Sequence, residues 1–282
     1  MRLFVEVAGL KWVPDGDVMR QRPTVLILHG GPGADSASAK ERFGFLSDVA
    51  QVVFYDHRGN GRSDDGDRGK WTLQQWGDDV EALCRALDIE RPIVIGGSFG
   101  GMVAMSYGTR HPEHPAALGL IATAAREPGT DEIVEAFREL GGDEVAELVR
   151  SDVEHTTPET HDRFIREAYP LMSRHPDAQA FVEREVRHTL GKPEVEIHFS
   201  NGEGKTMDFR ADLARVQRPT LVLSGEMDPI CPPSSFREIV EALPDGVGET
   251  YLIPGAGHMV MLDAKEDCEH ILRDFVLRHS PT

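Results

Sequence analysis

The sequence predicts a doubly wound α/β fold with a mostly parallel sheet and an inserted helical cap. Short apolar runs, typical of strands buried on both faces of a sheet, alternate with segments of helical periodicity. Between residues 125 and 214 the strand-like runs vanish and amphipathic helical patterns replace them. The alternation then resumes, as expected when one sheet is split by an insertion. We therefore predict an α/β domain over residues 1–124 and 215–282, and a cap over residues 125–214.

The overall composition excludes several classes of partner. The 282 residues include 30 Lys and Arg against 48 Asp and Glu, a formal net charge of −18. Such a balance argues against nucleic acid and anionic membranes as partners. No apolar run approaches the roughly 20 residues that span a bilayer, and the first residues lack the apolar core of a signal peptide. Three scattered cysteines favour a reduced, cytoplasmic setting. The oligomeric state stays open.

The predicted elements follow one another in a simple order. The strands are predicted at 3–7 and 10–13, as an opening antiparallel pair, and at 23–28, 51–56, 93–95, 116–122, 219–225 and 249–253. Helices are predicted at about 73–87, from 98 to about 110, at 235–243 and around 271–276. The acids Asp78, Asp79 and Glu81 are expected on the solvated face of the first of these helices. Arg58 and Arg62 are expected to hold their loop through Asp56 and Asp64.

A glycine-flanked serine stands where the strand at 93–95 meets the next helix. Gly96, Ser98 and Gly100 have the Gly-x-Ser-x-Gly spacing of a tight strand-to-helix turn. Strand and helix pack closely at such a turn, so its neighbouring positions need residues without side chains. The serine hydroxyl would lie at the positive end of the helix. Ser98 is therefore a candidate nucleophile.

Two further candidate groups also follow predicted parallel strands. Asp228 comes after the strand at 219–225, and His258 comes after the last strand. The carboxyl ends of parallel strands meet at one edge of a sheet, so these side chains are expected to gather there. A serine needs an imidazole to take its proton, and the imidazole needs a carboxylate to fix its tautomer. The chain order Ser98, Asp228, His258 fits this chemistry, with Glu226 as an alternative acid.

The negative charge on a substrate oxygen would need backbone donors. The run His29-Gly30-Gly31-Pro32-Gly33 follows a buried strand and exposes backbone N–H groups without side chains in the way. We expect the oxyanion site at the N–H groups of Gly31 and Phe99. Cys231 either lines the site or is a small packing residue. No motif indicates a metal or a cofactor, so none is expected.

Together these motifs resemble the α/β-hydrolase superfamily and, more narrowly, the proline iminopeptidase-like serine peptidases. The residues that carry the resemblance are His29-Gly30-Gly31-Pro32-Gly33, 55–63 (Tyr-Asp-His-Arg-Gly-Asn-Gly-Arg-Ser), Gly96-Gly97-Ser98-Phe99-Gly100-Gly101, Gly225-Glu226-Met227-Asp228 and Gly257-His258. The resemblance implies release of an N-terminal residue from a short peptide or amide, through an acyl-enzyme. Glu203 is similar to a cap glutamate that binds the substrate's amino end in that family. His29, Gly30 and Met259, beside the candidate catalytic groups, are expected to contact substrate.

Two other functions fit the same residues. One keeps the catalytic groups and acts on a carboxylic ester, a lactone or an activated carbon–carbon bond. The other is a non-catalytic receptor that uses the pocket to hold a small ligand. Either way the partner is a small molecule or a short peptide.

Overall fold

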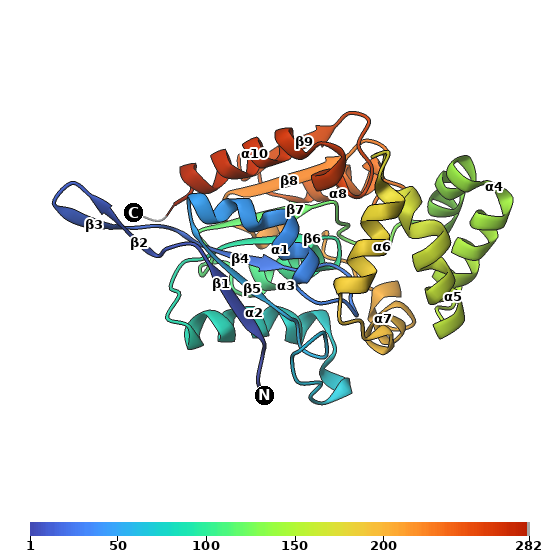
Figure 1. Cartoon of the computed structure of the whole chain (residues 1–282), viewed down its shortest axis with the longest axis horizontal. Coiled ribbons are helices and arrows are strands. Elements are labelled where there is room, and N and C mark those ends of the chain that lie inside the picture. Colours follow the sequence, from blue (N-terminus) through green and yellow to red (C-terminus); the bar gives the residue numbers. More distant parts are fainter. Residues whose placement is uncertain (281–282) are drawn as a thin grey trace.

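The computed structural model describes residues 1–280, so residues 281 and 282 of the second predicted α/β segment lie outside it. Within residues 1–280 the main sheet has seven strands in the order β1-β5-β4-β6-β7-β8-β9 (Figure 1). Only β1 runs antiparallel to its neighbour. The strands of this sheet are β1 (Val5–Ala8), β4 (Thr24–Leu28), β5 (Gln51–Tyr55), β6 (Ile93–Gly97), β7 (Ala117–Ile121), β8 (Thr220–Gly225) and β9 (Gly248–Ile253). This is the predicted mostly parallel, doubly wound sheet.

Helices cover both faces of the sheet. They are α1 (Ala37–Phe43), α2 (Leu73–Ala86), α3 (Phe99–Arg110), α8 (Pro233–Ala242), α9 (Val260–Asp263) and α10 (Lys265–Arg278). Alternate residues of each strand point to opposite faces, and the buried side chains divide accordingly into two cores. Leu26 and Val94 face α2, α3 and α8, whereas Ile27 and Ile95 face α1 and α10. Figure 1 shows α2 and α10 on opposite sides of the sheet.

The helical insertion lies between β7 and β8. Its helices are α4 (Thr130–Glu154), α5 (Pro158–Arg163), α6 (Ala178–His188) and α7 (Pro193–Ser200). They gather at one end of the sheet, on the right of Figure 1. The long α4 breaks at Gly142, whose φ of 80° is outside the helical range. Throughout residues 1–280, the helices are all too short or too polar to cross a bilayer.

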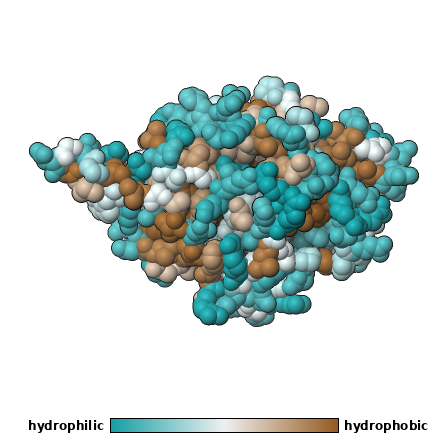
Figure 2. Space-filling view, viewed as in Figure 1, coloured by the Kyte–Doolittle hydropathy of each residue, from teal (hydrophilic) through white to brown (hydrophobic). Residues whose placement is uncertain are grey.

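The predicted opening strand pair is wrong. β1 pairs with β5 at the edge of the main sheet, while β2 (Trp12–Asp15) pairs with β3 (Val18–Gln21) in a separate hairpin. Gly16, at φ 61°, closes the two-residue turn between β2 and β3. Alternation identifies a strand without identifying its partner, which explains the error. The hairpin projects from the body in Figure 1, and Figure 2 shows apolar and polar residues mixed on its surface.

The predictions for the first helix and the Arg58–Arg62 loop are partly wrong. Asp79 is not solvated: it is buried, and Arg58 donates to it through Nε at 2.8 Å and Nη2 at 2.6 Å. Arg58 therefore holds the loop to α2 rather than to Asp64, which pairs with Arg2. Arg62 does bind Asp56, as predicted. Helical periodicity could not reveal a buried carboxylate whose cation comes from a different loop.

Candidate active site

Ser98 lies at the turn where β6 ends and α3 begins. Its φ of 53° and ψ of −122° place a non-glycine residue in a strained conformation. The surrounding chain holds this strain in place: Ser98 N–H donates to the Ile121 carbonyl at 2.9 Å, and Thr123 Oγ1 donates to the Ser98 carbonyl at 2.8 Å. The side chain is partly exposed and lines a cavity. A strained, accessible serine at a strand-to-helix turn is the geometry of a nucleophile elbow.

The glycines on either side of Ser98 are required by close packing. A Cβ at Gly96 would overlap the carbonyl oxygen of Gly100, and a Cβ at Gly100 would overlap the carbonyl oxygen of Leu28. Both obstacles are backbone atoms, which cannot move as a side chain can. The steric reason inferred from the Gly-x-Ser-x-Gly pattern therefore holds in the structure.

Gly100→Ala is expected to destabilise the protein by about 3 kcal/mol or more, because the new methyl group has to displace the backbone of β4. The measurement is the free energy of unfolding in urea. Gly44→Ala is the matched control, since Gly44 has a helical φ of −59° and its new methyl group would meet no atom of a more distant residue within 4 Å. An equal, small change in both variants would contradict the steric argument.

Asp228 and His258 lie close together at the ends of β8 and β9. The Asp228 side chain is fully buried, and its Oδ1 accepts from the N–H groups of Ile230 at 2.9 Å and Cys231 at 2.8 Å. Its Oδ2 is 2.8 Å from His258 Nδ1. When Nδ1–H donates to this carboxylate, Nε2 of the neutral ring is left as the proton acceptor. His258, like Ser98, lines the cavity.

The loop after β4 leaves backbone donors free near Ser98. Within residues 1–280, no hydrogen bond uses the N–H of Gly31 or of Phe99. Gly30 packs against Ser98: a Cβ on Gly30 would lie 3.6 Å from the Ser98 Cβ. Asn60 Oδ1 accepts from Gly33 N–H at 2.6 Å and fixes the far end of the loop. Both candidate oxyanion donors thus lie on segments that contact the serine.

His29 is committed to holding this loop. Its Nε2 accepts from His57 N–H at 3.0 Å, so Nδ1 carries the proton and donates to the Gly30 carbonyl at 2.7 Å. Burial lowers the pKa of His29, which favours this neutral form. His29 lines the cavity, but both of its ring nitrogens are occupied. Only the ring surface of His29 is therefore left to contact a molecule in the cavity.

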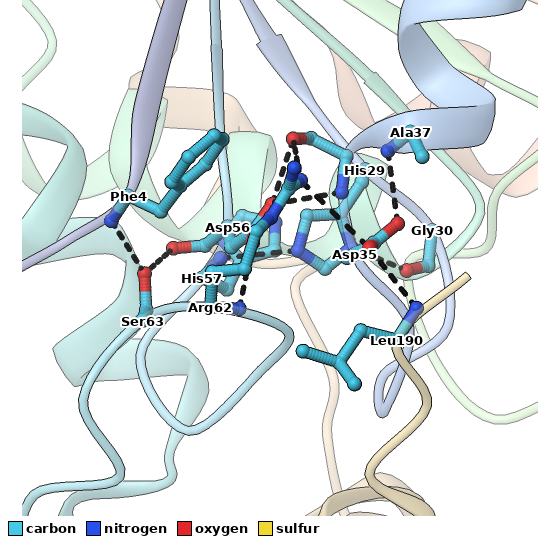
Figure 3. A network of polar contacts seen from close by, with 11 residues as sticks. Phe4, His29, Gly30, Asp35, Ala37, Asp56, His57, Arg62, Ser63 and Leu190 are labelled. Atoms are coloured by element: carbon cyan, nitrogen blue, oxygen red, sulfur yellow. Dashed lines mark hydrogen bonds and ion pairs between the residues drawn. The ribbon is translucent and has the colours of Figure 1, made fainter. Parts of the chain in front are cut away.

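Two buried carboxylates, those of Asp35 and Asp56, form a network of polar contacts next to the same loop (Figure 3). Asp56 accepts from Ser36 N–H and Oγ at 2.9 and 2.7 Å, and from Arg62 N–H and Nε at 2.8 Å each. Burial acts to raise the pKa of Asp56, but the hydrogen bonds from Arg62 and Ser36 outweigh it and keep the pKa below its usual value. Asp35 continues the network to the insertion, because its Oδ2 accepts from Leu190 N–H at 3.0 Å. A hydrogen bond therefore joins the segment that follows β4 to the connection between α6 and α7.

The cavity beside Ser98 has a volume of about 490 Å³, and both the sheet edge and the insertion line it. Apolar side chains make up much of the wall: Phe43, Phe99, Met102, Ile133, Phe164, Met172, Phe199, Met207 and Ile230. The volume is that of a site for a small molecule or a short peptide end. Gly30 and Met259, predicted as substrate contacts, lie on this wall, as does Cys231.

Four acidic residues of the insertion and its entry line the cavity, and one of them, Glu185, is paired with Arg42 at 2.7 Å. The other three lie outside this ion pair. They are Glu127, Asp152 and Glu196. Burial raises the pKa of each, and for Glu196 it raises the pKa to about 7, with the nearby Asp152 adding to the effect. The Glu196 carboxylate accepts from Ser200 Oγ at 2.6 Å, and Asp152 accepts from Thr160 Oγ1 at 2.6 Å. Within residues 1–280, no Lys or Arg forms an ion pair with any of the three acids.

The structure does not bring Glu203 and Glu226 to the cavity. The Glu203 carboxylate accepts from Leu73 N–H at 2.7 Å, and so caps the first turn of α2. Glu226 is exposed, while Asp228 makes the contact to His258. Sequence reasoning missed Asp152 and Glu196. Asp152 is one of sixteen acids between residues 127 and 189, Glu196 lies just beyond them, and only the packing of α5 against both α4 and α7 distinguishes the two.

Comparisons with known proteins agree with this architecture. The chain belongs to the family described as the alpha/beta hydrolase fold, which it matches over residues 23–265. It is 29% identical to the proline iminopeptidase PfmaB of Pestalotiopsis fici, over 93% of this chain and 95% of that protein. It is also 29% identical to the pimeloyl-[acyl-carrier protein] methyl ester esterase of Chromobacterium violaceum, over 95% of each chain.

Among solved structures, the chain is similar to a proline iminopeptidase from Mycobacterium smegmatis. The TM-score is 0.71 at 23% identity, with 99% of this chain and 95% of that chain covered. At this identity the likeness concerns the fold. The relatives thus define an α/β-hydrolase family enzyme and leave several substrate classes in view.

Proposed function

We propose that this protein is a serine hydrolase that releases the N-terminal residue from a short peptide or amide through an acyl-enzyme. In this mechanism Ser98 attacks the substrate carbonyl, and His258 Nε2 takes the serine proton and then gives it to the leaving amine. Asp228 keeps the proton on Nδ1 and stabilises the imidazolium. The N–H groups of Gly31 and Phe99 stabilise the oxyanion. Water then attacks the acyl-enzyme carbonyl while His258 Nε2 takes its proton, and the bond to Ser98 Oγ breaks as His258 returns that proton to the serine, which releases the free acid.

The choice of substrate rests on the carboxylates of Glu127, Asp152 and Glu196, which line the cavity. Carboxylates inside a mainly apolar site are costly to ionise without a cation. A protonated amino end, bound between Asp152 and Glu196, would supply that cation and favour their ionised forms. An ester with a neutral acyl chain would leave them uncompensated. The proposed cap, residues 125–214, would therefore select the amino end, and the sheet edge would perform the chemistry.

The test compares kcat/KM on prolyl and alanyl 4-nitroanilides with kcat/KM on the same compounds N-acetylated and on 4-nitrophenyl butyrate. The expected result is a preference of at least 100-fold for the free amino group. Glu196→Gln is expected to lower kcat/KM on the free-amino substrates by 10- to 100-fold and to leave 4-nitrophenyl butyrate within two-fold. Glu194→Gln, an exposed acid on the same helix, is the matched control.

An ester- or lactone-cleaving enzyme remains the second candidate, because the Chromobacterium violaceum relative is described as a methyl ester esterase. Faster turnover of 4-nitrophenyl butyrate than of any free-amino anilide would favour it. In that case Glu196→Gln should change kcat/KM on the free-amino anilides and on 4-nitrophenyl butyrate by similar factors.

The same glutamate gives a prediction about stability and pH. Glu196 has a pKa of about 7 in the folded protein against an ordinary value of 4.5, so the folded state binds the proton more tightly. Stability from this group is fully present below pH 4.5 and is lost as the pH rises to about 7. Glu196→Gln should therefore stabilise the protein at pH 8, by up to about 3 kcal/mol, and change little at pH 4.5. Urea unfolding at the two pH values measures this, and equal effects at both would contradict it.

A further inference from the structure

The insertion contacts the loop that carries His258. The segment 172–175, between α5 and α6, runs across this loop. His258 N–H donates to the Met172 carbonyl at 2.8 Å. The next residue, Met259, is buried against Phe181 and Val182 of α6. The candidate base therefore contacts the insertion through its own backbone and through the side chain that follows it.

Asp263 joins the same two segments through a single carboxylate. Its Oδ2 accepts from Gly257 N–H at 2.7 Å, immediately before His258. Its Oδ1 accepts from Ser173 Oγ and from the N–H groups of Arg174 at 3.0 Å and His175 at 3.1 Å. The donors on Oδ1 lie about 90 residues away along the chain, on the insertion. Oδ2 thus accepts from the loop that carries His258, and Oδ1 accepts from segment 172–175 of the cap.

Close packing leaves the loop little freedom to adopt another position. A Cβ on Gly257 would overlap the Met172 carbonyl oxygen, so the two backbones are in direct contact. On the other side, a Cβ on Gly225 would overlap the carbonyl oxygens of Gly257 and Ala256. The His258 loop is therefore held between the end of β8 and the cap segment 172–175.

We infer that Asp263 is a positioning residue that couples the seating of cap segment 172–175 to the placement of His258. The inference rests on the proposed function in taking His258 as the base. Its consequence is that segment 172–175 stays docked during turnover, because lifting it would take the Met172 carbonyl away from His258 N–H and leave Asp263 Oδ1 without its donors. Substrate would then enter past another part of the insertion.

The carboxylate is necessary because both oxygens must accept. An asparagine has one accepting oxygen and one donating NH2 group. In either amide orientation, Asp263→Asn places a donor against Gly257 N–H or against the donors of segment 172–175. Asp263→Asn therefore breaks the link while keeping the shape of the side chain. Ser173→Ala removes only one cap-side donor and is a milder probe, and Asp267→Asn, an exposed neighbour on α10, is the control.

Two measurements test the coupling. Hydrogen exchange of the intact protein should become at least 10-fold faster in Asp263→Asn at both 172–176 and 255–260, and about three-fold faster at the same two segments in Ser173→Ala. On the best substrate, kcat should fall 10- to 100-fold in Asp263→Asn with KM within three-fold, and Ser98 labelling by a fluorophosphonate should slow in proportion. Asp267→Asn should match the wild type in both measurements.

Faster exchange in only one segment would overturn the coupling. Faster exchange in both with an unchanged kcat would overturn the positioning role. A wild-type protein that neither turns over substrates nor reacts with fluorophosphonate would contradict the proposed function instead, while the exchange data would still decide whether Asp263 links the two segments.

Discussion

Ser98→Ala is expected to lower kcat on the best substrate by roughly 10⁴- to 10⁶-fold, because no other hydroxyl lies on the strained turn between β6 and α3 in residues 1–280. The fold should survive the change, since Ser98 makes its structural contacts through its backbone. Steady-state kinetics on the preferred 4-nitroanilide measure the loss, and a fluorophosphonate should label the wild type and not the variant.

Thr123→Ser is a suitable control for this experiment. It keeps the hydroxyl that donates to the Ser98 carbonyl and should retain activity within a few-fold. Residual activity in Ser98→Ala above about 1% of the wild type would show that another group performs the attack, and the nucleophilic role would have to be abandoned.

Asp228→Asn is expected to lower kcat by about 10⁴-fold with a small effect on stability. The asparagine oxygen can still accept from Ile230 and Cys231, so its NH2 group would face His258 Nδ1. The ring would then accept at Nδ1 and carry its proton on Nε2, where it cannot take a proton from Ser98. Kinetics and a thermal melt of the same preparation separate the catalytic loss from unfolding.

Glu226→Gln is the matched comparison, because Glu226 is the other acid that the sequence offers at the end of β8. It is exposed, and His258 Nδ1 is hydrogen-bonded to Asp228 instead. Activity within two-fold of the wild type is expected. A larger loss in Glu226→Gln than in Asp228→Asn would reverse the assignment of the acid.

The parallel strands of the main sheet could be predicted from the sequence, whereas the pairing of β1 with β5 could not. Continuous apolar runs such as 24–28 and 220–223 are typical of strands buried on both faces, and the structure confirms both. Ser98, Asp228 and His258 follow β6, β8 and β9, which run parallel, so their positions in the chain bring them to one edge of the sheet. Each of these inferences depends on residues near one another in the chain, where steric and hydrogen-bonding rules act most strongly.

The sequence was insufficient wherever a side chain's role depends on a distant partner. Asp79 resembles any acid on a solvated helix face until Arg58 reaches it from another loop. Glu203 is a glutamate in the predicted cap and so resembles a substrate-binding residue. Its carboxylate instead accepts from the first N–H group of α2. Asp263 follows His258 by only five residues, but its importance comes from donors on segment 172–175. Charge and periodicity give no information about these long-range contacts.

The position of the insertion also constrains the order in which the molecule can fold. β7 and β8 are adjacent, parallel strands, yet the whole of α4–α7 separates them along the chain. Closing so long a loop is entropically slow, so β8 and β9 should join a sheet whose first five strands have already formed. Ser98 lies in that early part, and Asp228 and His258 lie in the late part. During synthesis, the strained turn at Ser98 would therefore form well before Asp228 and His258, the acid and base proposed to activate it. The nascent chain would have no hydrolytic activity until β8 and β9 join the sheet.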